Sequence, residues 1–573
     1  MARHLITSAL PYINGVKHLG NLVGSMLPAD VYARHLRSDG HEVLFISATD
    51  EHGTPAELAA LEAGQPVADY CAEQHEVQKD LCQRFELSFD WFGRTSRHQN
   101  HELTNHFARR LRDQGFTEIR TTAQVYSLAD GRFLPDRYVV GTCPNCGYER
   151  ARGDQCENCG KPLDPTDLIE PRSAVSGSTQ LEVRDASHVF LLQSKLSDRI
   201  RSWVDTQDDW PQLARSIAYK WLDEGLQDRG ITRDLDWGIP VDPDDFPEVA
   251  GKVWYVWFDA PIGYLGATRE WADAGLGGDD AQAAFDRWWR TDKGAGDVTY
   301  TEFMGKDNVP FHTLTFPATI LGSGEDWKLV DRLKSFNWLT YYGGKFSTSL
   351  HRGIFMSDAL ELLGADYWRW YLMSNAPESD DSSFTWELFA SAVNKDLVGT
   401  FGNLVNRTVT QISRHFDDVV PEGGEPEQVE AELAERVSTR LSEYLGHMDS
   451  LDFRKAAAAL RALWAEGNVY LESREPWKTV KTDRDRTACT LRTAVGLVAM
   501  SAVVSEPWVP DAAERLKASF PSVDWSGVGL GQLAAGRAIV APGDPIVAPG
   551  LLFQKLAPEQ LAEWSERFGG GES

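Results

Sequence analysis

The chain has 573 residues, of which 42% are hydrophobic and 25% charged, a composition typical of a soluble globular protein of several domains. Its net charge of −28 argues against a general nucleic-acid binder, because nonspecific affinity for phosphate comes from Lys and Arg, but it leaves room for an RNA held by local, base-specific contacts. The sequence shows no secretory signal, and its most apolar stretch, residues 494–504, is too short for the ~20 residues that span a bilayer, so we expect a cytoplasmic protein without a membrane segment.

The first 50 residues predict the opening of a doubly wound parallel sheet. A β-rich run at residues 5–10 meets Pro and Gly breakers, and apolar residues then recur at helical spacing over residues 22–36. Residues 42–48 predict the next buried strand. Pro28 lies inside the predicted helix, where it should cause a kink. This β-turn-α-β order is typical of an α/β (Rossmann) fold.

An insertion of short strands and turns at residues 115–235 separates this unit from a second strand-and-helix region. In that region, strands are predicted at residues 252–258, 299–304 and 336–342, and a helix at residues 310–321. We therefore expect one catalytic Rossmann domain in two halves, residues 1–114 and 236–355.

The rest of the chain is mostly helical in pattern and predicts a helix bundle with a core of its own. Helices are predicted at residues 403–415, 429–448, 453–475 and 487–504. The expected boundaries are a linking region at residues 356–390, the bundle at residues 391–535 and a C-terminal peptide at residues 536–573.

Four of the seven cysteines fall within the insertion as CPNC-x9-CENC: Cys143, Cys146, Cys156 and Cys159. Two C-x2-C turns supply four thiolates, which suits tetrahedral Zn²⁺ with no open coordination position. Without a secretory signal, metal ligation is favoured over disulfides, and the alternative is four reduced cysteines. We predict one structural zinc ion per chain.

The turn after the first predicted strand, PYINGVKHLGNL, places His18, Gly20 and Asn21 at the start of a helix. The unpaired N–H groups at a helix N-terminus suit phosphate, and glycine lets a nucleotide approach the backbone. The alternative is an ordinary turn with a surface histidine.

A glycine-rich loop at residues 343–349, GGKFSTS, follows a predicted strand much later in the chain. Lys345 supplies charge, and Ser347 and Thr348 supply hydroxyl donors, which suits a mobile loop that stabilises charge on a transferring nucleotidyl group. The alternative is a polar surface loop.

Together, the turn and the loop resemble the paired HIGH and KMSKS signatures of class I aminoacyl-tRNA synthetases. Asn21 stands where the family has its final His, and Thr348 where it has its second Lys, so Lys345 or Arg352 would have to stabilise pyrophosphate. The resemblance implies that His18, Asn21 and Lys345 are catalytic. It also implies that ATP, with Mg²⁺, is bound by His18, Gly20, Asn21, Asp307, Lys345, Ser347 and Thr348.

Four further blocks, SALPYINGVKHLGN, TDEHGTP, WFDAPIGYLG and GKDNVPFH, resemble the methionyl branch of this family. Its Asp50 would hold the substrate ammonium, although a turn aspartate is the alternative. Aromatic walls suit a thioether, although a bare aromatic cluster is more often core. The resemblance implies that L-methionine is bound by Leu10, Tyr12, Asp50, Trp257, Ala260, Pro261, Tyr264 and His312.

The length of the insertion also bears on which amino acid is activated. Enzymes that separate side chains differing by one methylene need long editing domains, because one methylene gives only ~1–3 kcal/mol of discrimination, and the insertion is too short for one. A cysteinyl enzyme would place zinc in its synthetic site, whereas these cysteines lie in the insertion.

In the predicted bundle, Asn403 and Arg407 are four residues apart and share a helix face, and Trp477 lies on another helix. An Asn, an Arg and an aromatic ring suit unpaired bases, although a capped helix and a core tryptophan would explain them too. The resemblance implies that these three read the anticodon of tRNA(Met), elongator and initiator, and that the linking region contacts the tRNA stem. Without the extra C-terminal dimerising domain of some members, a monomer is expected.

Two alternatives stay open at this point. One is another small class I synthetase, which differs in the amino acid that supports activation. The other is a catalytically silent paralogue that binds tRNA or a partner, suggested by Thr348 and the acidic composition. The presence of the pocket residues Asp50, Trp257 and His312 argues against a catalytically silent paralogue.

Overall fold

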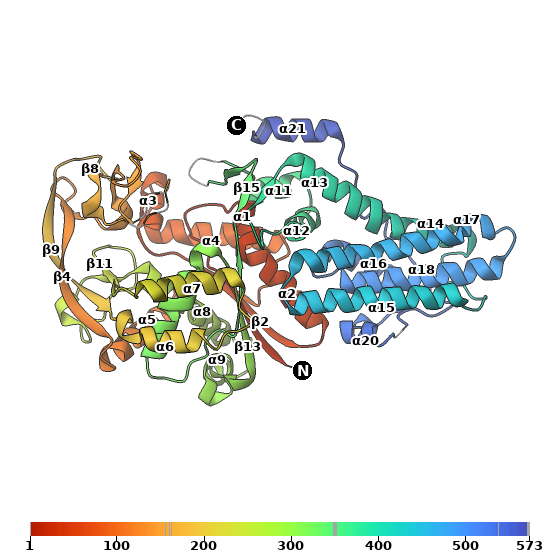
Figure 1. Ribbon diagram of the computed structural model, residues 1–573, viewed down its shortest axis with the longest axis horizontal. Coiled ribbons are helices and arrows are strands. Elements are labelled where there is room, and N and C mark those ends of the chain that lie inside the picture. Colours follow the sequence, from red (N-terminus) through yellow and green to blue (C-terminus); the bar gives the residue numbers. More distant parts are fainter. Residues whose placement is uncertain are drawn as a thin grey trace.

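The computed structural model describes residues 2–154, 156, 158, 159, 161, 163–347, 352–536 and 538–569. Along its longest axis, the inserted region with β4, β8 and β9 lies at one end and the helices α14 to α18 at the other (Figure 1). A parallel sheet lies between them.

The central sheet has five strands in the order β14-β13-β1-β2-β3, and every neighbouring pair is parallel. The strands are β1 (Arg3–Ser8), β2 (Glu42–Thr49), β3 (Trp91–Arg94), β13 (Val298–Gly305) and β14 (Arg332–Phe336). The two halves of the sequence meet where β1 pairs with β13. This confirms the predicted doubly wound sheet divided by an insertion.

The helix after β1 accommodates Pro28 through a change in its winding. It begins as α1 (Leu19–Asn21), continues as a π-helical segment, η1 (Leu22–Met26), and then becomes α2 (Leu27–Ser38), with Pro28 in the first turn. Proline has no N–H for the bond that a continuous α-helix would make to the carbonyl four residues earlier. The wider π turn before Pro28 accommodates the proline at the place where the sequence predicted a kink.

The predicted strand at residues 252–258 was wrong. Only β12 (Val253–Trp254) is extended, and α8 (Val256–Asp273) begins two residues later. Short apolar runs do not distinguish a buried strand from a buried helix, and α8 is buried along most of its length. The strand predicted at residues 336–342 is shorter, β15 (Leu339–Tyr341).

The other predictions for this half are confirmed. Residues 299–304 lie in β13, and the predicted helix at residues 310–321 forms as a π segment, η9 (Phe311–Thr315), followed by α10 (Phe316–Gly322).

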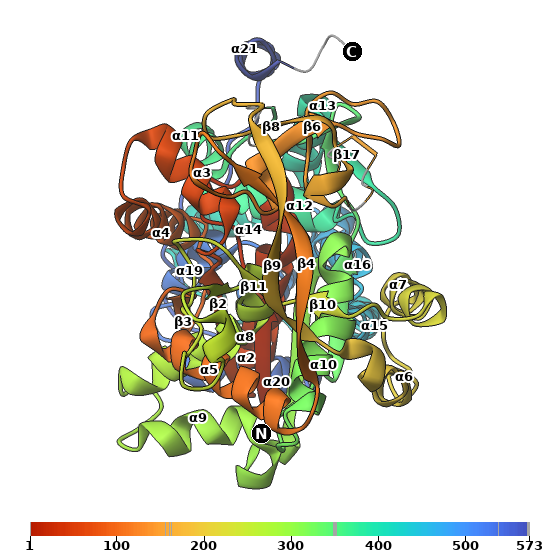
Figure 2. The same cartoon turned by 90° about the vertical axis from the view of Figure 1, so that its left-hand side faces the viewer.

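The insertion is built on a long antiparallel ribbon, which faces the viewer in Figure 2. Strands β4 (Thr117–Ser127) and β9 (Leu181–Leu191) pair along their whole length. The cysteine region next to this ribbon contains β6 (Val139–Thr142), β7 (Ala151–Arg152) and β8 (Ile169–Ser173), in the order β7-β6-β8.

The helices of the C-terminal half form where they were predicted. They are α14 (Asn403–His415), α15 (Gln428–Asp449), α16 (Phe453–Arg474) and α18 (Arg484–Val504). Among the described residues, α18 alone is long and apolar enough to cross a membrane, but 83% of its most apolar window is buried inside the protein. It is the central helix of the bundle.

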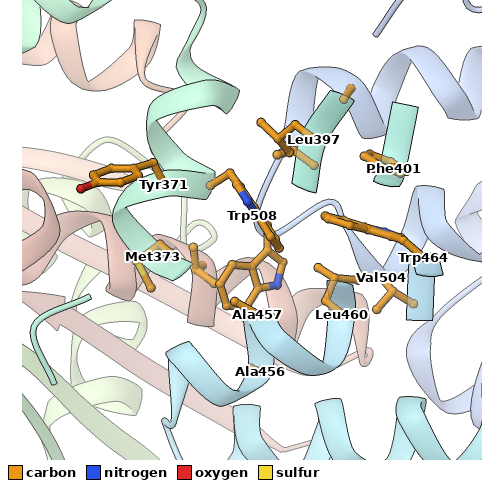
Figure 3. Packing of buried hydrophobic residues seen from close by; sticks show 14 of the residues in the cluster. Tyr371, Met373, Leu397, Phe401, Ala456, Ala457, Leu460, Trp464, Val504 and Trp508 are labelled. Atoms are coloured by element: carbon orange, nitrogen blue, oxygen red, sulfur yellow. The ribbon is translucent and has the colours of Figure 1, made fainter. Parts of the chain in front are cut away.

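The bundle does not have a core of its own, contrary to the sequence-based expectation. One continuous apolar cluster runs from the helices that cover the sheet into the bundle (Figure 3). In it, α12 (Ala365–Ser374) contributes Trp370, whose ring lies 4.8 Å from that of Trp464 and 6.1 Å from that of Trp508. The linking helix therefore belongs to both halves of the molecule.

A fully buried ion pair lies in the same junction. Arg369 of α12 donates to Asp30 of α2 at 2.6 Å, and also to the backbone oxygens of Pro507 at 2.7 Å and Phe85 at 3.0 Å. Asp30 also accepts from the backbone N–H and the hydroxyl of Ser88, both at 2.6 Å. Burial alone would raise the pKa of Asp30, but its cationic and hydroxyl partners hold it below its ordinary value.

Replacing Arg369 by Met should lower the free energy of unfolding by about 3–5 kcal/mol, because it leaves the Asp30 carboxylate buried without its cation. The midpoint of urea unfolding measures the change. Arg440→Ala is the control, since its exposed pair with Glu443 at 2.9 Å should add nothing measurable. Equal midpoints for the two variants would contradict the expectation.

Candidate functional site

A cavity of about 330 Å³ lies at the carboxyl-terminal edge of the parallel sheet, where doubly wound folds bind ligands. Sequence analysis predicted half of the residues that line it: Leu10, Tyr12, His18, Gly20, Asn21, Asp50, Trp257, Ala260, Pro261, Tyr264, Asp307, His312 and Lys345. The predicted ATP and methionine residues thus surround one space. Ser347 does not line this cavity, and Thr348 lies outside the described residues.

At the start of α1, His18 and Asn21 hold each other in place. His18 Nδ1 accepts from the backbone N–H of Asn21, and Asn21 Oδ1 accepts from the backbone N–H of His18, both at 3.2 Å. Burial lowers the pKa of His18 to about 4, with a further contribution from the charge of Lys17. The imidazole is therefore neutral at pH 7, and because Nδ1 accepts, its proton resides on Nε2. This gives the turn a neutral donor suited to phosphate oxygens.

Asp50 follows β2 directly and is 5% exposed. Its backbone is anchored to the turn that follows β1, since Asp50 N–H donates to the oxygen of Pro11 and its own oxygen accepts from the N–H of Ile13, both at 2.9 Å. Its Oδ1 has no hydrogen-bond partner among the described residues. Burial, together with Asp259 and Glu51, raises its pKa well above the ordinary value. A buried carboxylate oxygen of this kind is completed by a cation.

The two buried carboxylates that raise the pKa of Asp50, Glu51 and Asp259, were not assigned by sequence analysis. Glu51 accepts from Arg94 at 2.8 and 3.1 Å, while His52 Nδ1 lies 2.8 Å from Asp259 Oδ2. In the block TDEHGTP, sequence analysis assigned a role only to Asp50. Because Asp259 belongs to WFDAPIGYLG, the two blocks meet through this pair.

The opposite wall carries a chain of directed hydrogen bonds. His312 Nδ1 lies 2.9 Å from the backbone oxygen of Asn308, and its Nε2 lies 2.8 Å from Tyr264 Oη. A carbonyl can only accept, so Nδ1 carries the proton and Tyr264 donates to Nε2. Burial lowers the pKa of His312 to about 4, so the ring is uncharged at pH 7. With the rings of Trp257 and Phe311, 4.8 Å apart, it makes a neutral, polarisable wall.

The glycine-rich loop begins at β16 (Gly344–Lys345), which pairs with β15. The Lys345 ammonium lies 4.4 Å above the ring of Trp338, beside the cavity. Ser347 and Arg352 close the described part of the loop through two backbone hydrogen bonds of 3.1 and 3.0 Å. Arg352 also donates to the backbone oxygen of Tyr341 at 3.1 Å, so it is Lys345 that faces the cavity.

The sulfur atoms of Cys143, Cys146, Cys156 and Cys159 all lie within 4.8 Å of one another. The distances are 3.9 Å from Cys143 to Cys159 and 3.6 Å from Cys146 to Cys156. A tetrahedral zinc ion about 2.3 Å from each sulfur sets the sulfurs about 3.8 Å apart, so the cluster fits the ion that its spacing predicted.

Two amide side chains complete the cysteine cluster. Asn145 donates to the sulfur of Cys159 at 3.5 Å, and Asn158 donates to that of Cys146 at 3.6 Å. Each C-x2-C turn therefore donates a hydrogen bond to a sulfur of the other turn. Donors of this kind stabilise thiolates around a metal.

In the bundle, two of the three predicted residues are in direct contact. The Arg407 guanidinium lies 4.8 Å above the ring of Trp477, which belongs to the short helix α17 (Pro476–Thr479). Arg407 also contacts the exposed carboxylate of Glu472 at 2.8 Å, and Asn403 donates to Asn468 at 2.9 Å. Arg407 and Trp477 thus lie against each other, and Asn403, on the same helix as Arg407, contacts α16.

The chain matches two family models. The model described as tRNA synthetases class I (M) matches residues 4–409, and that described as the anticodon binding domain of methionyl tRNA ligase matches residues 420–573.

Full-length relatives agree with these matches. The chain is 59% identical to the methionine–tRNA ligases of Streptomyces avermitilis and of Caulobacter vibrioides NA1000, over 100% of each chain. It is also similar to the structure of Mycobacterium tuberculosis methionyl-tRNA synthetase in complex with methionyl-adenylate, with a TM-score of 0.78 and 26% identity over 96% of this chain and 100% of that one.

Replacing Cys146 by Ser should lower bound zinc from about one ion per chain to a small fraction of that, because three thiolates no longer close the tetrahedron. Metal analysis of the purified protein after dialysis measures it. Cys489→Ala, which changes a buried cysteine outside the cluster, should keep its zinc. Full zinc occupancy in the Cys146 variant would show that the cluster does not ligate the ion.

Proposed function

The chain belongs to the methionyl family of class I tRNA synthetases, and on that premise we propose which of its own residues carry out the reaction of a methionine–tRNA ligase. The enzyme activates L-methionine with ATP to methionyl-adenylate and pyrophosphate, and then transfers the methionyl group to the 3′ end of tRNA(Met).

One observation carries the assignment: the cavity combines an unpartnered buried carboxylate oxygen with a neutral, aromatic wall. Asp50 Oδ1 would accept from the ammonium of methionine. Its thioether would lie among Trp257, Tyr264 and His312, with Leu10, Tyr12, Ala260 and Pro261 completing the pocket. Because burial keeps His312 neutral, no ion has to be desolvated against the sulfur.

ATP would lie across the turn at the start of α1. His18 Nε2–H and the Asn21 amide are oriented by their mutual hydrogen bonds and would donate to phosphate oxygens, while Gly20 lets the nucleotide approach the backbone. Asp307, which also lines the cavity, would accept from the ribose hydroxyls or face the loop. Mg²⁺ that accompanies ATP supplies further charge neutralisation when bound.

In the activation step, a methionine carboxylate oxygen attacks the α-phosphorus, and the bond from the α-phosphorus to the oxygen that bridges it to the β-phosphorus breaks. Pyrophosphate leaves with the electron pair. Lys345 lies on a hairpin beside the cavity and would stabilise the charge that develops on the leaving group, with Ser347 and Thr348 of the same loop as hydroxyl donors.

The remaining regions would serve tRNA. Four cysteines would hold a structural zinc ion that shapes the insertion near the acceptor end, the linking region would contact the stem, and Asn403, Arg407 and Trp477 would read the anticodon. We also propose that the protein acts as a monomer in the cytoplasm.

ATP–pyrophosphate exchange, measured with all twenty amino acids in the absence of tRNA, should proceed with methionine alone. Lys345→Ala should lower the rate by about 100-fold or more, because one cation facing the transferring group is lost. Exchange with a different amino acid would overturn the pocket assignment. No exchange by folded, zinc-replete wild type would favour the silent paralogue, and an unchanged rate in the variant would remove Lys345 from the mechanism.

Arg407→Ala and Trp477→Ala should each lower kcat/KM for tRNA(Met) in aminoacylation by about 10- to 100-fold, because each removes a contact to an unpaired base. Exchange without tRNA should stay unchanged in both. Arg440→Ala on α15 controls for a general loss of positive charge from the bundle. If aminoacylation in all three variants matched wild type, the trio would not read the anticodon.

A further inference from the structure

Lys17 is a buried cation in the wall of the cavity that no part of the proposed mechanism uses. It lies on the turn between β1 and α1, is 6% exposed and lines the same space as Asp50 and His18. Its Nζ donates to Asn14 Oδ1 at 3.0 Å. Within the part of the chain that the structure describes, no other hydrogen bond and no carboxylate within 4.0 Å is found for this ammonium. An ammonium has three N–H donors, so two are left for acceptors inside the cavity.

The backbone around Lys17 is held from both sides. Its carbonyl oxygen accepts from the N–H of Met356 at 2.8 Å, and that of Ile354 accepts from the N–H of Leu19 at 3.0 Å. Residues 354–356 follow the glycine-rich loop directly. The position of the ammonium is therefore set by the framework that also positions the two signature elements.

The charge of Lys17 acts on the two groups that define the ends of the site. It opposes the protonation of Asp50, where the substrate ammonium would bind, and it lowers the pKa of His18, where the phosphates would bind. With an ammonium on Asp50 and phosphates at His18, the methionine carboxylate and the α-phosphate would lie between these two residues. These are the atoms that react.

We propose that Lys17 is a catalytic residue, whose ammonium donates hydrogen bonds to the methionine carboxylate and to a non-bridging α-phosphate oxygen during adenylate formation. This inference rests on the proposed function. The new bond joins the carboxylate oxygen to the α-phosphorus, and the electron pair of the broken bond leaves with pyrophosphate. No proton transfer is required of Lys17, only a cation where two anionic groups approach and negative charge grows on the phosphorus oxygens.

The number of positive charges in the two signature motifs gives an independent reason to assign Lys17 a role in the reaction. Thr348 stands where the family's loop carries its second lysine, so the loop supplies one cation fewer to the transferring group. Lys17 provides a cation to the same cavity from the turn between β1 and α1 instead of from the loop. Its burial makes that charge more effective than an exposed one, because water screens it less.

Burial also determines the protonation state of Lys17 in the free enzyme. It lowers the pKa of Lys17 to about 7, against the opposing effect of Asp50. The other charged or titratable groups that line the cavity are Tyr12, Asp50, Asp307, Lys345 and Tyr264, with His18 and His312 uncharged at this pH. A cation is required, so kcat/KM for ATP should fall as the pH rises through about 7 and Lys17 loses its proton.

The test compares Lys17→Met with Lys17→Arg in methionine-dependent ATP–pyrophosphate exchange. The Met variant keeps the apolar stem and should lose about 100-fold in kcat, with KM for methionine within about threefold of wild type. The Arg variant should recover much of the rate and shift the alkaline limb of kcat/KM for ATP upward, because guanidinium stays protonated. Methionine binding without ATP, followed by tryptophan fluorescence, checks that the pocket is intact.

A loss in the Met variant confined to KM for methionine would overturn the proposal and leave Lys17 as a counter-ion of Asp50. An unchanged kcat, in a preparation where Lys345→Ala is impaired, would also overturn it while the proposed function stands. An alkaline limb that persists unchanged in Lys17→Arg would assign that limb to another group and contradict the role. Wild type that does not exchange with methionine would remove the proposed function and this inference with it.

Discussion

The buried ion pair between Asp30 and Arg369 ties together the parts of the molecule on which the site depends. Asp30 lies on α2, and the other end of that continuous helix presents the turn with His18, Gly20 and Asn21. Arg369 belongs to the linking helix, and through its further hydrogen bonds it reaches the segment between α18 and the next helix. Neither charged group is exposed, and each has several hydrogen-bond partners. Because breaking such a pair leaves a charge without compensation, the catalytic half and the bundle are held in one arrangement.

Desolvation is the common cause of the chemistry in the cavity. It keeps His18 and His312 neutral, raises the pKa of Asp50 and lowers that of Lys17. The same burial therefore has different consequences for the two imidazoles and for the Asp50 and Lys17 side chains. The imidazoles become directed donors and acceptors whose tautomers are set by their neighbours, whereas the carboxylate and the ammonium gain from any ligand that supplies the opposite charge. A zwitterionic amino acid beside a polyanion supplies both.

The acidic surface and the recognition of an RNA are compatible because they act at different scales. A net charge of −28 disfavours indiscriminate phosphate binding, while Arg407 above Trp477 offers a local cation and a stacking face. Since the apolar core is continuous from the sheet to the bundle, this surface is held rigidly relative to the cavity. Specificity can then come from a few contacts spaced by the fold.

The sequence by itself determined the fold class, the split sheet, the bundle helices and the cysteine cluster, because short-range periodicity and fixed motif spacings express them directly. The resemblance to the family added half of the residues that surround the cavity. It did not determine that residues 256–258 are helical, since a short apolar run suits either a buried strand or a buried helix. Tertiary structure alone decided three features: the shared core, the ion pair of Asp30 with Arg369, and the hydrogen bond between Tyr264 and His312. The same holds for Lys17, an ordinary lysine in a turn until packing buries it. Burial and partner choice depend on residues distant in sequence, and these are the quantities that set charge state and reactivity.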